Sequence, residues 1–227
     1  LVFWLLTLGT LRADLLTYPY IQDLSADKAV LCWVSHDADP VSVRWLGEEA
    51  LSQVTPTSAL DFNPAELEEF PDLSSQPRFL HTVTLDKIEG RDKIEYQVQF
   101  PNEPYNNAFR GLPSAQERVR IIAYGDSETE PESTGKPAKW ATPEDPKRLY
   151  LVDQTTGYQA NLEAIGKRAP NAVLIAGDLV ESGGEQRDWD EFWRHKKTIA
   201  GATPFLTAPG NHEYYAGRRQ GKYETEA

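Results

Sequence analysis

Three short apolar segments in the second half of the chain each end in a glycine that is followed by an oxygen-bearing side chain. The segments are residues 119–124 before Gly125-Asp126, 173–176 before Gly177-Asp178, and 205–208 before Pro209-Gly210-Asn211. Runs of this length bounded by turn residues are typical of buried strands. Between them, apolar residues recur at helical spacing, first at Tyr158, Leu162 and Ile165, then at Trp189, Phe192, Trp193 and Ile199. This alternation of strands and helices predicts a β-α-β-α-β unit with a parallel sheet.

The polar residues after these strands are predicted to meet at one edge of the sheet. Loops at the carboxyl ends of neighbouring parallel strands open onto one crevice, so Asp126, Asp178 and Asn211 should lie close together. Carboxylate and amide oxygens are ligands for hard metal ions. An alternative is that Asp126 and Asp178 cap the helices that follow them. The Asn211-His212 pair after the third strand favours the metal site.

Three blocks at these strand ends resemble the signature blocks of a known family. Gly125-Asp126-Ser127-Glu128, Gly177-Asp178-Leu179-Val180-Glu181 and Gly210-Asn211-His212-Glu213 are similar to the first three blocks of the calcineurin-like metallophosphoesterases. The order and the spacing of the blocks also agree with that family. The third block is the most specific of the three, because Gly-Asn-His-Glu rarely follows a buried strand by chance.

The resemblance implies hydrolysis of phosphate esters at a centre of two divalent or trivalent metal ions, with Fe, Mn, Mg and Zn as candidates. Asp178 would bridge the two ions, Asp126 would bind the first, and Asn211 would bind the second. His212 would be the catalytic residue that stabilises the transition state or protonates the leaving oxygen. A metal-bound hydroxide would attack phosphorus, with phosphomonoesters favoured over phosphodiesters.

Two positions depart from the family pattern. Many members have a metal-binding His where this chain has Glu128, and purple acid phosphatases have an iron-binding Tyr where it has Glu181. Both glutamates are further candidate ligands, and carboxylates shift the preference toward Mn²⁺, Mg²⁺ or iron over Zn²⁺. They also keep open an alternative function, a non-catalytic cell-surface binding protein with a degenerate metallophosphoesterase domain. Because the histidine-bearing later blocks are not reached by Ala227, we expect an N-terminal fragment that is inactive on its own.

The first half of the chain has the pattern of an antiparallel β-sandwich. Segments rich in β-branched and aromatic residues recur between turn residues at 29–34, 41–45, 81–85 and 94–100. This spacing predicts short strands with Trp33 and Trp45 in the core. Residues 46–77 are acidic and contain four prolines, which predicts long inter-strand loops with one helical turn at 65–69.

Two further resemblances concern this first half. The turn that leads to Tyr96 resembles the corner of fibronectin type III domains that a Tyr hydroxyl caps. Residues 18–22 resemble the opening of the N-terminal domain of purple acid phosphatases, which is fibronectin-like. The predicted fold is therefore a fibronectin III-like sandwich at 16–113, followed at 117–227 by the N-terminal part of an α/β metallophosphoesterase sandwich.

Charge and the N-terminal residues indicate partners and location. The net charge of −12 argues against a nucleic-acid surface, which requires clustered Lys and Arg. Residues 1–13 resemble a truncated signal peptide, with a buried strand or helix as the alternative. Their apolar run is shorter than the ~20 residues that span a bilayer, so no stable membrane span is expected. We expect a secreted, periplasmic or cell-surface protein that acts on a small phosphate ester, with Cys32 as a buried apolar side chain.

Overall fold

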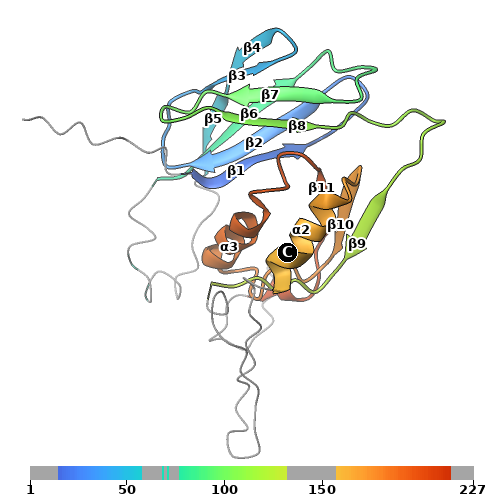
Figure 1. Cartoon of the computed structure of the whole chain (residues 1–227). Helices are drawn as coiled ribbons and strands as arrows, with labels where there is room; N and C mark the ends of the chain where they lie inside the picture. The colour runs from blue at the N-terminus through green and yellow to red at the C-terminus, as the bar shows by residue number, and fades with distance from the viewer. Residues whose placement is uncertain (1–14, 58–67, 69–70, 72–76, 132–156, 216–227) are drawn as a thin grey trace, which may run out of the picture.

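A computed structural model describes residues 15–57, 68, 71, 77–131 and 157–215 (Figure 1). The proposed signal peptide at 1–13 lies outside the described residues, and so does most of the helical turn expected at 65–69. Within the described part of the chain, no helix is long and apolar enough to cross a membrane. The described residues form two four-stranded sheets and one three-stranded sheet.

The first half of the chain forms the two four-stranded sheets, in which all strand pairs are antiparallel. One sheet has the order β1-β2-β6-β5 and the other the order β4-β3-β7-β8. The strands are β1 (Leu15–Gln22), β2 (Ala29–Ser35), β3 (Ser42–Trp45), β4 (Glu48–Leu51), β5 (Gln53–Pro56), β6 (Phe79–Leu85), β7 (Ile94–Val98) and β8 (Tyr105–Phe109). A buried apolar cluster with members in both sheets includes Trp33 and Trp45, as the sequence predicts.

Strand β2 is buried on both faces, which explains why it reads as a continuous apolar run. Leu31 and Trp33 point into the cluster between the two sheets. Cys32 lies on the other face, 2% exposed, in a small cluster with Tyr20 and Ala200. The expectation that Cys32 is a buried apolar side chain is therefore confirmed.

The expectation of loops throughout residues 46–77 is wrong for residues 48–56, which form β4 and β5. Both strands are short, and β4 is an edge strand that pairs only with β3 in its sheet. Strand β5 lies at the edge of the other sheet, where it pairs with β6. Edge strands of this kind carry charged residues and proline on their exposed sides, which hides the apolar alternation in the sequence.

The second half of the chain forms the predicted β-α-β-α-β unit. Its elements are β9 (Ile121–Tyr124), α2 (Gln159–Lys167), β10 (Ala172–Ala176), α3 (Gln186–Lys196) and β11 (Phe205–Ala208), followed by the 3-10 helix η3 (His212–Tyr214). The sheet has the order β11-β10-β9, and both strand pairs are parallel. Helices α2 and α3 share one buried cluster with Val173 and Ile175 of β10, so both pack against the same face of the sheet. On the other face Ile121 and Leu206 are 53% and 57% exposed.

The two halves are in direct contact through β1 and α3 (Figure 1). The rings of Tyr20 and Trp193 stack with centroids 4.2 Å apart, and the amide of Ile21 donates to the carbonyl of Ala200 at 3.1 Å. The hydroxyl of Tyr96 donates to the carbonyl of Gly201 at 2.9 Å. Tyr96 therefore does not cap its own corner, as the fibronectin resemblance implied, but joins the sandwich to the second half.

Candidate metal centre

The loops after β9 and β10 run side by side, as the parallel sheet predicts. The amide of Glu128 donates to the carbonyl of Asp178 at 2.9 Å, and the amide of Thr129 donates to the carbonyl of Leu179 at 3.2 Å. An isolated parallel bridge between Thr129 and Val180 continues this pairing. The first two sequence blocks are therefore held together by backbone hydrogen bonds rather than by side chains alone.

Three acidic residues of these loops adopt positive φ, a region that non-glycine residues rarely occupy. The φ angles are 53° at Asp126, 38° at Glu128 and 51° at Asp178. Such backbone strain persists only where surrounding contacts impose it, and it is common at functional sites. Neither Asp126 nor Asp178 caps α2 or α3, because the N-cap positions of these helices are Tyr158 and Glu185. The capping alternative is therefore excluded for these two helices.

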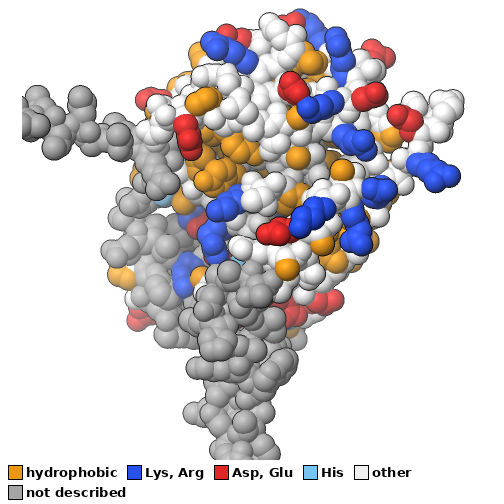
Figure 2. All heavy atoms as spheres, in the orientation of Figure 1, with side chains coloured by type: hydrophobic (Ala, Val, Ile, Leu, Met, Phe, Trp, Pro, Cys, Tyr) orange, Lys and Arg blue, Asp and Glu red, His pale blue; other side chains and the backbone are white. Residues whose placement is uncertain are grey.

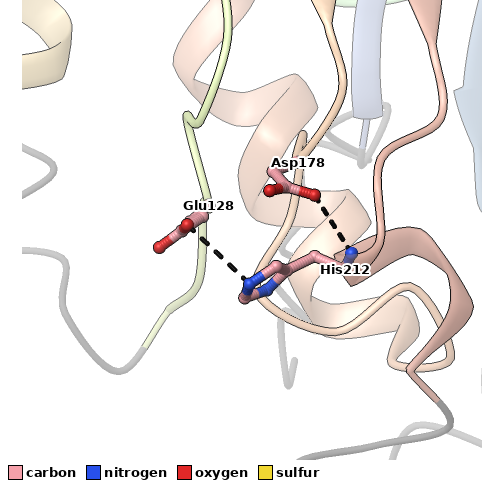
Figure 3. A group of neighbouring side chains, drawn as sticks. All are labelled: Glu128, Asp178 and His212. Atoms are coloured by element: carbon pink, nitrogen blue, oxygen red, sulfur yellow. Dashed lines mark hydrogen bonds and ion pairs between the residues drawn. The ribbon is translucent and has the colours of Figure 1, made fainter. Parts of the chain in front are cut away.

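Glu128, Asp178 and His212 form the candidate centre (Figure 3). One ligand atom from each residue lies within 4.8 Å of the others. Two ligands of one ion with bonds of ~2.2 Å lie at most ~4.4 Å apart, so small side-chain movements would let the carboxylates of Glu128 and Asp178 share an ion beside the imidazole of His212. His212 is 8% exposed, and Glu128 and Asp178 are half-buried. Carboxylate oxygens are ligands that suit Mn²⁺ or iron.

The imidazole of His212 is oriented by its neighbours. Its Nδ1 lies 2.8 Å from the carbonyl oxygen of Glu181, and since a carbonyl only accepts, Nδ1 carries the proton. Nε2 faces Glu128, with 3.8 Å between Nε2 and Oε1. The backbone amide of His212 donates to Oδ1 of Asp178 at 3.0 Å. The hydrogen bond to the carbonyl of Glu181 therefore fixes both the tautomer and the direction of the ring, and leaves Nε2 facing the centre.

The predicted site residues lie on neighbouring loops, but only some of them converge. Within the described residues, the group of His and acidic donors contains Glu128, Asp178 and His212, and Asp126 stands outside it on an exposed position. Asn211 is also exposed, and its side-chain amide donates to the hydroxyl of Tyr215 at 2.8 Å. Glu181 lies on the other side of His212, with Oε2 3.8 Å from Nδ1. The roles of all six residues stay predictions.

The sequence interpretation assigned no role to Glu213, the last residue of the third block. Its carboxylate accepts hydrogen bonds from three backbone amides of the loop after β10, including that of Asp178, and from the amide of Gly210 in its own loop. A glutamate directly after the Asn-His pair was the available signal. Its partners are backbone amides of a distant loop, which residue types do not encode.

A buried polar cluster behind the centre was also missed. The hydroxyls of Tyr124 and Tyr158 lie 2.9 Å apart, and Nζ of Lys196 donates to the hydroxyl of Tyr158 at 2.6 Å. Burial raises the pKa of Tyr158 to about 12 and lowers the pKa of Lys196 well below its ordinary value. Tyr124 directly precedes the first block, so this cluster supports the end of β9.

Comparison with known proteins defines the class. Residues 119–227 match the family described as calcineurin-like phosphoesterase. This match covers all three blocks and identifies a calcineurin-like phosphoesterase domain in the second half of the chain.

Within that class the chain is similar to purple acid phosphatases. It is 23% identical over 229 residues to the probable inactive purple acid phosphatase 27 of Arabidopsis thaliana. The match covers 86% of this chain and 34% of that protein. The probable inactive purple acid phosphatase 24 of the same plant is 23% identical over 222 residues, with the same coverage. A solved purple acid phosphatase from yellow lupin seeds superposes with a TM-score of 0.60 at 20% identity, over 88% of this chain and 36% of that chain. The chain thus spans about a third of the length of these relatives.

Proposed function

We propose that the protein hydrolyses phosphate esters in a metal-dependent reaction, with phosphomonoesters favoured over phosphodiesters. The observation that carries the proposal is the convergence of Glu128, Asp178 and the oriented ring of His212 at the carboxyl ends of parallel strands. The calcineurin-like phosphoesterase domain supports hydrolysis of phosphate esters in general. A pair of bound metal ions would supply positive charge for the phosphate and activate water at neutral pH.

The proposed ligands are the oxygens of Asp126, Asp178 and Asn211, with Asp178 shared between two ions and Glu128 and Glu181 as further candidates. Carboxylates at 128 and 181 favour Mn²⁺, Mg²⁺ or iron over Zn²⁺. His212 would act on the substrate, because its Nε2 faces the centre while Nδ1 is held by the carbonyl of Glu181. Removal of His212 should therefore reduce turnover more than metal affinity.

The remaining proposals concern organisation and location. Residues 16–113 would form a fibronectin III-like domain, and residues 117–227 the N-terminal part of the catalytic domain. The two antiparallel sheets of the first half support the former, and the family match supports the latter. The protein would be secreted, periplasmic or on the cell surface, where it would act on a small phosphate ester. Lys and Arg side chains are mixed with Asp and Glu on the face shown in Figure 2, which supports a partner other than nucleic acid.

A second function, non-catalytic binding at the cell surface, is favoured by two observations. Glu128 and Glu181 replace residues that bind metal in active members of the resembled family. Two similar plant proteins carry "probable inactive" in their names. In this case the sandwich would engage a polymer or a protein, and the phosphoesterase domain would be a scaffold.

The test compares the full-length natural protein with its Asp178→Asn variant after loading with Mn²⁺ or iron. Hydrolysis of p-nitrophenyl phosphate and of its bis ester is measured together with bound metal. We expect monoester hydrolysis that Asp178→Asn reduces by at least a factor of about 100, because an amide is a weaker ligand that cannot neutralise two cations. Glu103→Gln, at an exposed position of the sandwich, should behave like the unmodified protein. Absence of turnover with every metal would favour the binding function.

A further inference from the structure

The carboxylate of Glu213 accepts four hydrogen bonds from backbone amides, three from the loop after β10 and one from Gly210 in its own loop after β11. Oε2 accepts from the amides of Asp178 at 3.0 Å and Gly210 at 2.6 Å, and Oε1 accepts from those of Leu179 at 2.7 Å and Val180 at 3.3 Å. An ionised carboxylate has about four acceptor positions. Glu213 therefore uses its full capacity on the backbone and is not available as a metal ligand or a base.

The amides of residues 178–180 converge on one carboxylate because the loop turns sharply after β10. Gly177 and Asp178 have φ angles of 89° and 51°, and successive amides in such a turn form a concave site for an anion. In this chain the anion is the carboxylate of Glu213. Charge-assisted hydrogen bonds of this kind are stronger than those between neutral groups, so they can hold Asp178 in its unfavourable backbone conformation.

The two loops also interlock in the opposite direction. Oδ1 of Asp178 accepts a hydrogen bond at 3.0 Å from the amide of His212, the residue before Glu213. Gly210 allows this close approach, because a Cβ added there would lie 2.2 Å from Oδ1 of Asp178. The position of the Asp178 carboxylate thus depends on the same backbone that Glu213 fixes.

We propose that Glu213 is a positioning residue that sets the backbone of Asp178 and thereby directs its carboxylate toward Glu128 and His212. It acts through Asp178 and does not touch the metal or the substrate. The inference deepens the proposed function, since it assumes that Asp178 is a metal ligand. The backbone contacts themselves can be measured without metal.

The test uses the variants Glu213→Gln and Glu213→Asp. Amide hydrogen exchange reports the four backbone bonds in the metal-free protein, and titration with Mn²⁺ reports the orientation of Asp178. In Glu213→Gln we expect the amide of either Leu179 or Gly210 to exchange at least about ten times faster, because the NH₂ that replaces one carboxylate oxygen cannot accept the hydrogen bond of the amide that it faces. Mn²⁺ affinity should fall by a factor of about 10, the lower end of what loss of a ligand's supporting contact costs. Glu163→Gln, exposed on α2, is the matched control and should change neither quantity.

Glu213→Asp keeps the charge with a shorter side chain, so it tests the proposal if Glu213→Gln does not fold. It should lose Mn²⁺ affinity with little loss of thermal stability. Unchanged amide exchange at both Leu179 and Gly210 in the folded variants would show that Glu213 does not form the clamp, which is the set of four hydrogen bonds that its carboxylate accepts. Faster exchange with unchanged Mn²⁺ affinity would overturn the positioning role. If the unmodified protein binds no Mn²⁺, the metal centre itself is wrong and the positioning role falls with it, whereas the exchange data still report whether the clamp exists.

Discussion

Lys196 is a fully buried amine in the second half of the protein. Its Nζ donates to the hydroxyl of Tyr158 at 2.6 Å and lies 3.1 Å from the ring centroid of Phe192. Contact with an aromatic face and one hydroxyl recovers only part of the hydration free energy that an ammonium group loses on burial. The residue therefore costs stability at a position where an apolar side chain of similar length would fit.

Replacement of Lys196 by Met should stabilise the protein by about 1–4 kcal/mol at pH 7, by analogy with the range found when buried ion pairs are replaced by apolar side chains. The pKa of Lys196 is lowered in the folded state by burial, so between that pKa and 10.5 the unfolded chain binds the additional proton. The free energy of unfolding should then rise with pH across this interval in the unmodified protein, and the rise should be absent in Lys196→Met.

Urea unfolding at pH 7, 8.5 and 10 measures both effects. The control is Lys197→Met, since the neighbouring Lys197 is exposed and its replacement should leave the pH dependence intact. A Lys196→Met protein that is less stable at pH 7 than the unmodified one would contradict the prediction.

At the scale of elements, the contact between the sandwich and α3 contains a buried ion pair. Nη1 and Nη2 of Arg78 lie 2.8 Å and 2.5 Å from Oδ1 and Oδ2 of Asp190, and the two side chains are 8% and 26% exposed. Arg78 directly precedes β6 and Asp190 belongs to α3, so the ion pair connects the two halves of the chain. The guanidinium and the carboxylate each contribute two atoms to the pair, and this bidentate arrangement is the strongest geometry for an Arg–carboxylate pair.

Arg78→Ala should destabilise the protein by about 3–5 kcal/mol, because it leaves Asp190 partly buried without its cation. A double-mutant cycle with Asp190→Ala, measured by urea unfolding, should give a coupling energy of at least about 1 kcal/mol. The exposed pair Arg44–Glu49 is the matched control, and its cycle should give no measurable coupling. Additive effects at Arg78 and Asp190 would show that this ion pair contributes nothing to holding the two halves together.

The elements of the second half could be predicted because apolar residues and turn residues mark in the sequence where each strand or helix lies. Strands β9, β10 and β11 are short apolar runs with turn residues on both sides, and parallel pairing then brings the three blocks together. Edge strands β4 and β5 were hidden because β4 begins with two glutamates and β5 consists of Gln, Val, Thr and Pro, so neither shows a clear apolar alternation. The sequence also does not indicate that His195 of α3 is only 3% exposed beside Glu191, since aromatic spacing alone does not reveal a polar contact inside a core.

The candidate centre was predictable in its residue types and less so in its geometry. Asp178 and His212 were identified from the blocks, and the structure brings them together with Glu128. The hydroxyl contact from Tyr96 to Gly201 and the amide contacts of Glu213 depend on backbone atoms far away in sequence. Such partners have no residue signature, so sequence patterns cannot specify them.

At the scale of the whole molecule, the described helices α2 and α3 both cover the same face of the parallel sheet. On its other face Ile121 and Leu206 are 53% and 57% exposed, and β11 is an edge strand. Exposed apolar side chains on a sheet edge promote association between molecules. This face is therefore the main candidate for self-association among the described surfaces.

Leu206→Lys should reduce self-association at high protein concentration, because a charge at the centre of the edge opposes strand pairing. The melting temperature should change little, since the side chain is already more than half exposed. Sedimentation velocity across a concentration series measures the effect. Leu51→Lys is the control, since Leu51 is 66% exposed on β4 of the sandwich. Equal effects of the two substitutions would argue against a role for this face.

The loops at 126–130 and 177–181 are joined by backbone hydrogen bonds. The candidate centre therefore depends on which residues of the two loops are paired, as well as on which residue types the loops contain. Side chains alternate in direction along such paired segments, so a displacement by one position would put the hydroxyl of Ser127 or Thr129 where the carboxylate of Glu128 now stands. A single inserted residue after Tyr124 would thus remove a negative charge from the centre while every acidic residue remained in the chain. An intact set of signature blocks does not by itself guarantee an intact site.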